Sequence, residues 1–225
     1  MTTVRRRILV GGLAGLAVVA AVIFWPSAPI DLRKVDPEEL ARREAAAWRA
    51  YYEERYPTLF WQVFQITRNT YGFSLADSMR LSYHAARSAA YFRRSNQDAD
   101  IAAARRHMGA YYRLISEKSL RPFDHERAGT LELEWWRMRR EKRPPEDWAQ
   151  VIAAQCGVVY GLPNGHFLPA TRLRVEAMVY RDAHRHVEMD EANWRIIQNT
   201  LTESARKFRK ALENASVKKP AQKPA

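Results

Sequence analysis

The feature that most constrains this chain is an uncharged apolar segment near its amino end, preceded by three consecutive arginines. Arg5 to Arg7 are followed by an unbroken run from Ile8 to Trp25 that carries no charged residue. As a helix the run is roughly 27 Å long at about 1.5 Å per residue, close to the thickness of a bilayer's hydrocarbon core. We therefore expect a transmembrane anchor over residues 8–25.

A cleaved secretion signal is the alternative interpretation of this segment. Ala28 is the only plausible small residue for cleavage, and Pro29 directly after it makes the site a poor one. We therefore expect the anchor to be retained. The three arginines resist translocation more than Arg33 and Lys34 on the other flank, so the amino end should stay cytoplasmic and the domain should lie on the periplasmic or extracellular side.

Composition and charge divide the chain into five predicted parts. These are a cytoplasmic basic N-terminus (1–7), the transmembrane anchor (8–25), a linker (26–35), one helical domain (36–214) and a disordered basic tail (215–225). The net charge is +12, and removing the three N-terminal arginines and the three lysines of the tail leaves +6 for the domain. Because the arginines alternate with acids and the domain is predicted to be exported, we expect no nucleic-acid partner. Lys218, Lys219 and Lys223 could instead contact anionic lipid, and an acidic protein surface would also fit.

Apolar residues recur at helical spacing almost throughout the domain. Asp36, Pro37 and Glu39 form the start signal of the first helix, and Pro57 leaves open whether the next segment is a kinked continuation or a separate helix. Further helices should begin near residues 74, 98, 124, 145, 169 and 190. No segment alternates with period two long enough to form a strand, so we predict an all-α fold of seven or eight helices in a bundle or irregular stack.

The pattern also predicts which side of each helix is buried. On the helix that starts at Ser74, one side should be formed by Leu75, Met79, Ser82, Ala86 and Ala90. On the last helix the same reasoning selects Trp194, Ile197, Leu201, Ala205, Phe208 and Leu212.

Catalytic signatures are missing from the sequence. It contains no nucleophile elbow, no dinucleotide or phosphate loop, and no His-Glu-x-x-His or paired Glu-x-x-His motif, so we predict no cofactor. The one cysteine, Cys156, lies in an apolar stretch without a basic neighbour and should be a buried small residue. His184 and Glu188 could share a helix face, but two ligands are too few for a metal site, so we predict none.

Two polar clusters are the candidate ligand-binding residues. The first contains Glu132, Trp136, Arg139 and Arg140, where an arginine beside a tryptophan and a carboxylate suits an anionic or planar ligand. The second steps by fours along the seventh helix through Arg172, Glu176, Tyr180 and His184. The two could line one pocket containing a general base, or the first could be a salt-bridged seam between helices, which we favour.

Three functions are compatible with these features. The leading hypothesis is a membrane-tethered interaction or assembly subunit that docks a protein partner through an exposed aromatic patch. The alternative is an exported membrane-tethered enzyme, or a binder of a small anionic ligand, that uses the Arg/Trp/Glu cluster. The third is a helical protein that lies on anionic lipid. No motif identifies a reaction or a catalytic residue.

Overall fold

The computed structural model describes residues 28–94, 98–184, 186–187 and 189–217, and within them the chain forms one all-α domain. Its eight α-helices are α2 (Pro37–Tyr52), α3 (Tyr56–Gln65), α4 (Leu75–Arg94), α5 (Asp98–Lys118), α6 (His125–Arg140), α7 (Pro145–Tyr160), α8 (Leu168–Ala183) and α9 (Glu191–Val217). A π-helix, η1 (Ile66–Thr70), follows α3, and a 3-10 turn, η2 (Asn164–His166), precedes α8. The all-α class and the number of helices are confirmed.

The predicted anchor over residues 8–25 lies outside the described residues. Among the helices that are described, none combines the length and the apolar character needed to cross a bilayer. The amino-terminal run is therefore the one segment on which the prediction of a membrane anchor depends.

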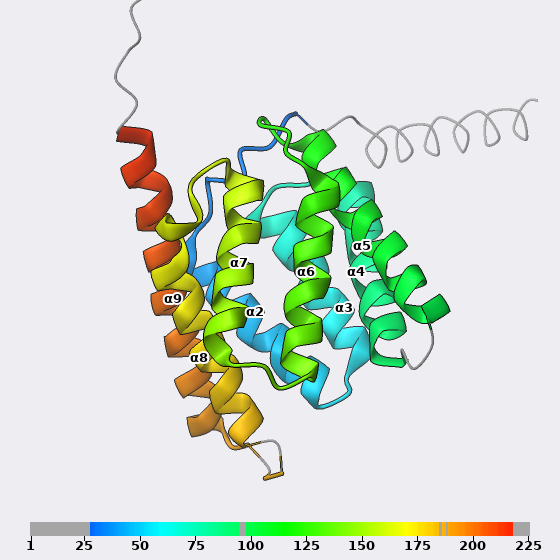
Figure 1. Ribbon diagram of the computed structural model, residues 1–225, viewed down its shortest axis with the longest axis vertical. Coiled ribbons are helices and arrows are strands. Elements are labelled where there is room, and N and C mark those ends of the chain that lie inside the picture. The colour runs from blue at the N-terminus through cyan, green and yellow to red at the C-terminus, as the bar shows by residue number, and fades with distance from the viewer. Residues whose placement is uncertain (1–27, 95–97, 185, 188, 218–225) are drawn as a thin grey trace, which may run out of the picture.

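The helices close into a ring. Each α-helix packs against the next one along the chain, and α9 packs against α2. In Figure 1, α6, α7 and α8 form the near layer, α2 and α3 lie behind them, and α9 and the α4–α5 pair close the two sides. Short connections make sequential neighbours antiparallel, which is the packing expected of a helical bundle.

Aspartates cap three of the helices, as their sequence signals predict. Asp36 accepts hydrogen bonds from the backbone N–H groups of Glu38 and Glu39, at 2.9 and 3.0 Å. Asp124 and Asp190 accept equivalent bonds at the starts of α6 and α9. Each such cap contributes about 1 kcal/mol by satisfying an N–H group that has no partner within its helix.

The segment around Pro57 forms a separate helix. Residues 53–55 turn the chain between α2 and α3, and Glu54 adopts a positive φ of 57° there. Pro57 is then the second residue of α3, a position where the missing N–H group of proline has no cost. The alternative of a kinked continuation is therefore wrong.

The interior is filled by side chains from opposite sides of the ring. Trp48 of α2 packs against a buried cluster from α6, α7 and α8 that includes Trp135, Trp148 and Met178. On the other side, Trp194, Ile197 and Leu201 of α9 pack against α2 and α8, which agrees with the predicted side of that helix. Contacts that cross the ring, and not only contacts between neighbours, thus hold the domain together.

The predicted buried side of α4 is wrong in part. Leu75 and Met79 are 40% and 48% exposed, and Ala86 is also exposed. The buried residues are instead mostly small and polar: Asp77, Ser78, Leu81, Ser82 and Ser88. The hydroxyls of Ser82 and Ser88 donate to the carbonyls of Ser78 and Ala104, each at 2.9 Å. The small side chains on this side of α4, of which Ser88 bonds across to α5, let α5 approach closely, so the longer apolar residues of α4 face outward.

Part of the predicted linker is packed onto the domain. Ile30 pairs with the connection between α5 and α6, where its N–H donates to Lys118 and its carbonyl accepts from Leu120, both at 2.8 Å. Ile30, Leu32 and Val35 are buried. In Figure 1 the described chain begins at the upper end of the domain, where α9 also ends. The upper end of the domain in Figure 1 is therefore the end nearest in sequence to the apolar run.

Candidate functional site

Glu132 of α6 is the centre of a polar network inside the ring. Its carboxylate accepts hydrogen bonds from the indole N–H of Trp136 and the hydroxyl of Tyr112 on α5, both at 2.8 Å. The amide of Gln155 on α7 donates to the same carboxylate and, at 2.6 Å, to the Tyr112 hydroxyl. One charged group thus joins three helices.

Tyr112 is kept protonated by its surroundings in this network. Burial raises the pKa of the Tyr112 phenol well above its ordinary value, and the adjacent negative charge of Glu132 raises it further. The phenol therefore stays protonated and donates its proton to the carboxylate. It is a structural donor at any pH near neutrality.

Arg139, also from α6, forms a second junction. Its guanidinium makes two bonds to the carboxylate of Asp182 on α8, at 2.7 and 2.9 Å, and a third to the Tyr52 hydroxyl of α2 at 2.5 Å. Burial disfavours the charge of Arg139, but the bonds that it donates to Asp182 and Tyr52 outweigh this, so the pKa of Arg139 is raised. Arg139 and Glu132 therefore belong to an interhelical seam in which each charged group has its partner within the chain.

Trp136 and Arg140 contact α4. The Trp136 ring meets Phe92 edge-on, with the ring centroids 5.3 Å apart. The guanidinium of Arg140 lies 3.8 Å from the centroid of the Phe92 ring and donates to the Phe92 carbonyl. Both residues thus attach α6 to the end of α4.

The second candidate cluster, on α8, does not lie against the first candidate cluster, on α6. Arg172 pairs with Glu146 of α7 at 2.7 Å on the surface, and Tyr180 donates to Asn193 of α9 at 2.6 Å. His184 stacks on Tyr180 and bonds its carbonyl, while Glu176 is exposed. These side chains are directed to three different surroundings, so the structure does not bring the two clusters together.

The partly buried pair of Arg174 and Glu44 was not predicted from the sequence. Arg174 of α8 contacts Glu44 of α2 at 2.5 Å, and its guanidinium lies 5.8 Å from the Trp48 ring and 5.6 Å from the Trp135 ring. Burial opposes its charge, but Glu44 outweighs this and the pKa of Arg174 is raised. Arg174 directly precedes Val175 and lies four residues before Met178, and both of these residues are buried on α8. This helical spacing could have indicated from the sequence that Arg174 lies near the interior.

Cys156 is not a reactive thiol, and the described part of the chain holds no cluster of metal ligands. Burial raises the pKa of the Cys156 thiol to about 12, so the thiol is protonated and a poor nucleophile at neutral pH. Within that part, no three or more His, Cys, Asp or Glu side chains gather as metal ligands. Glu188, the suggested partner of His184, lies outside the described residues.

Three exposed apolar residues form a row on α4: Leu75, Met79 and Tyr83, here called the α4 stripe. These side chains are 40%, 48% and 50% exposed and are spaced four residues apart, so they follow one side of the helix. Tyr83 is held edge-on against His107 of α5, with the ring centroids 5.7 Å apart. The sequence pattern alone assigned two of these residues to the core.

Comparison with known proteins gives no relative from which a function could be carried over: no family model, no curated protein and no solved structure matches the chain. The function must therefore be inferred from the geometry of this chain.

Proposed function

We propose that this chain is a single-pass, membrane-anchored interaction or assembly subunit whose helical domain lies on the non-cytoplasmic side. The observation that carries the proposal is the α4 stripe. Exposed apolar residues that follow one helix face are typical of a surface that receives a partner, whereas single scattered ones are ordinary.

The stripe suits a helix or a flat surface with an apolar centre. Leu75, Met79 and Tyr83 extend over slightly more than two helical turns. Covering three half-exposed side chains contributes roughly 1 kcal/mol each, because about half of the transfer free energy of a full side chain is still to be gained. That is sufficient for the centre of a small interface, and further contacts are needed around it.

The surroundings of the stripe select an acidic partner. Arg80 lies between Leu75 and Tyr83 in sequence and is 62% exposed, and its distance to Asp77 is 4.0 Å. Arg87, one turn beyond Tyr83, stacks on Tyr91 with 4.6 Å between the guanidinium carbon and the ring centroid. A partner with acidic residues around an apolar centre would pair with these arginines and would also fit the basic excess of the domain.

The candidate ligand cluster supports the alternative function less well. Glu132, Trp136 and Arg139 direct their hydrogen-bonding groups to one another or to neighbouring helices. A ligand would have to displace these bonds and leave partly buried charged and polar groups without their partners, which opposes binding. An enzyme or anionic-ligand binder that uses this cluster therefore remains the second proposal.

Co-purification tests docking at the stripe. The full chain is extracted in mild detergent from the cells that make it, and the chains that accompany it are identified and quantified. Met79→Glu should remove the partner, because it places a charge at the centre of the apolar row. Ile196→Glu is the matched control, since Ile196 is similarly exposed, at 46%, on the distant helix α9. Equal recovery of every accompanying chain with both variants would overturn docking at this stripe.

The orientation has its own test. A protease added to intact spheroplasts should cut the domain if it lies outside the cytoplasmic membrane. Cutting only after lysis would place the domain in the cytoplasm and would contradict the exported topology, whatever the stripe binds.

A further inference from the structure

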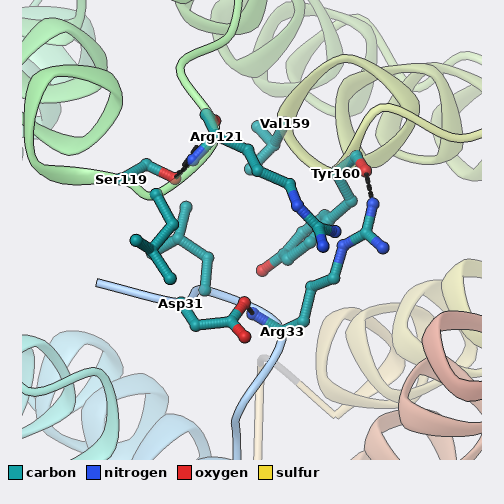
Figure 2. A pocket seen from close by; sticks show the side chains of 8 residues that line it. Asp31, Arg33, Ser119, Arg121, Val159 and Tyr160 are labelled. Carbon is teal, nitrogen blue, oxygen red and sulfur yellow. Dashed lines mark hydrogen bonds between the residues drawn. The ribbon is translucent and has the colours of Figure 1, made fainter. Parts of the chain in front are cut away.

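A hollow at the upper end of the domain contains two arginines side by side. It is lined by the incoming chain, the α5–α6 connection and the end of α7, through Asp31, Leu32, Arg33, Ser119, Leu120, Arg121, Val159 and Tyr160. Its empty space, about 220 Å³, includes open solvent. Figure 2 shows the guanidinium groups of Arg33 and Arg121 next to each other above the Tyr160 ring.

Arg33 is fixed in this position by the backbone. Its guanidinium donates to the Tyr160 carbonyl at 2.6 Å, and its own N–H donates to the carboxylate of Asp31 at 3.2 Å. Burial lowers the pKa of Arg33, and the positive charge of Arg121 lowers it further, although Asp31 acts in the opposite direction. The chain therefore holds Arg33 beside a like charge.

Arg121 is fixed only through its backbone. Its N–H donates to the Ser119 hydroxyl at 3.2 Å, and that hydroxyl donates back to the Arg121 carbonyl at 3.1 Å. Across residues 28–94, 98–184, 186–187 and 189–217, its guanidinium has neither an ion pair nor a hydrogen bond. Arg121 is exposed, and its guanidinium lies beside that of Arg33 at the hollow (Figure 2), where its N–H donors are available to a ligand.

Two adjacent guanidinium groups repel each other, and Asp31 provides one negative charge against two positive ones. An anion with several oxygens at this point would remove the repulsion and satisfy the free donors of Arg121 by two parallel bonds. We propose that the Arg33–Arg121 pair binds a phosphate group. A phosphate ester suits the pair better than a carboxylate, because its oxygens can reach both guanidinium groups at once.

The position of the hollow indicates where this phosphate comes from. Arg33 is eight positions after Trp25, the last residue of the apolar run, so the extended chain between them spans at most about 28 Å. If the run spans a bilayer, the hollow lies within this distance of the headgroup layer, and we assign the phosphate to an anionic lipid. The lipid source rests on the anchor of the proposed function, whereas phosphate binding itself does not.

The first experiment uses inorganic phosphate as the probe. The full chain in a nonionic, phosphate-free detergent is titrated with phosphate at 0.1 M salt and pH 7, followed by calorimetry. A saturable heat is expected, and Arg121→Gln and Arg33→Gln should each weaken binding roughly tenfold or more. The control Arg195→Gln removes the same charge from an exposed position on α9 and should leave binding unchanged.

The second experiment identifies the source. The full chain is placed in nanodiscs of phosphatidylcholine with or without phosphatidylglycerol, and its thermal unfolding midpoint is measured. A higher midpoint with phosphatidylglycerol that Arg121→Gln abolishes, while Arg195→Gln retains it, supports the lipid headgroup.

The possible outcomes separate the claims. Phosphate binding without a phosphatidylglycerol effect supports the phosphate site, with a soluble phosphate ester as its ligand, and overturns the lipid source. No saturable heat and no lipid effect would overturn the site altogether. Equal losses in Arg121→Gln and Arg195→Gln would attribute any binding to net charge and would also overturn it. Docking at the α4 stripe is measured by different variants, so the two proposals can fail separately.

Discussion

Replacing Glu132 by leucine is the sharpest test of how the interior of this domain is held together. Leucine is similar in size to the whole glutamate side chain, so the change removes the carboxylate with little change in volume. Three donors on three helices lose their acceptor: the Trp136 indole, the Tyr112 hydroxyl and the Gln155 amide. Gln155 still donates to the Tyr112 oxygen at 2.6 Å, so the amide keeps one bond.

The magnitude follows from the donors that are left without a partner. The Trp136 N–H and the Tyr112 O–H lose their acceptor inside the protein, at about 1–3 kcal/mol for each such group. Leucine regains about 1 kcal/mol by burying apolar surface without a charge to desolvate. The two donors together cost about 2–6 kcal/mol, so after the gain of about 1 kcal/mol we expect Glu132→Leu to lower the free energy of unfolding by about 1–5 kcal/mol.

The assay is urea unfolding of the full chain in nonionic detergent at pH 7, followed by helical circular dichroism. For a domain of this size the dependence on urea is about 2–3 kcal/mol per molar, so the midpoint should fall by roughly 1 M. Glu176→Leu is the matched control: the same change at an exposed position of α8 should alter stability by less than about 0.5 kcal/mol.

A Glu132→Leu variant that is as stable as wild type, or more stable, would refute this reasoning. It would mean that the buried carboxylate is retained at a cost to stability, as functional charges often are. The alternative function of ligand binding at the cluster would then become the better proposal.

Three further predictions follow from the glycines and the cysteine. Gly157→Ala should lower the free energy of unfolding by about 1–3 kcal/mol, because its Cβ would lie 2.9 Å from the Leu162 carbonyl oxygen; urea unfolding measures this. Gly109→Ala should raise it by about 0.5–1 kcal/mol in the same assay, since nothing lies within 4 Å of the new Cβ in the middle of α5; a loss would contradict the open space there. Burial raises the pKa of the Cys156 thiol to about 12, so iodoacetamide at pH 8.5 should modify it only in urea. The stability from this buried neutral thiol is complete below its unfolded pKa of about 8.5 and should decline as the pH rises toward 12; a reactive thiol in the folded chain would contradict both statements.

Local sequence determined the elements of this domain. Asp36, Asp124 and Asp190 mark three helix starts because a short acceptor side chain bonds the first free N–H groups wherever the fold places the helix. Gly161 ends α7 with a φ of +63°, a conformation that other residues rarely adopt. Such signals depend on a few neighbouring residues, so they can be recognised without knowledge of the tertiary structure.

Only the tertiary structure decided which side of each helix is buried and which distant residues meet. The apolar period on α4 selected Leu75 and Met79 for the core, but the small serines of its other side let α5 pack more closely there. Arg33 and Arg121 lie 88 positions apart and meet because the incoming chain pairs with the α5–α6 connection. Helical periodicity shows that a helix has two sides, whereas which side is buried depends on the shape and the hydrogen-bonding groups of its neighbours, and these are set by contacts distant in the chain.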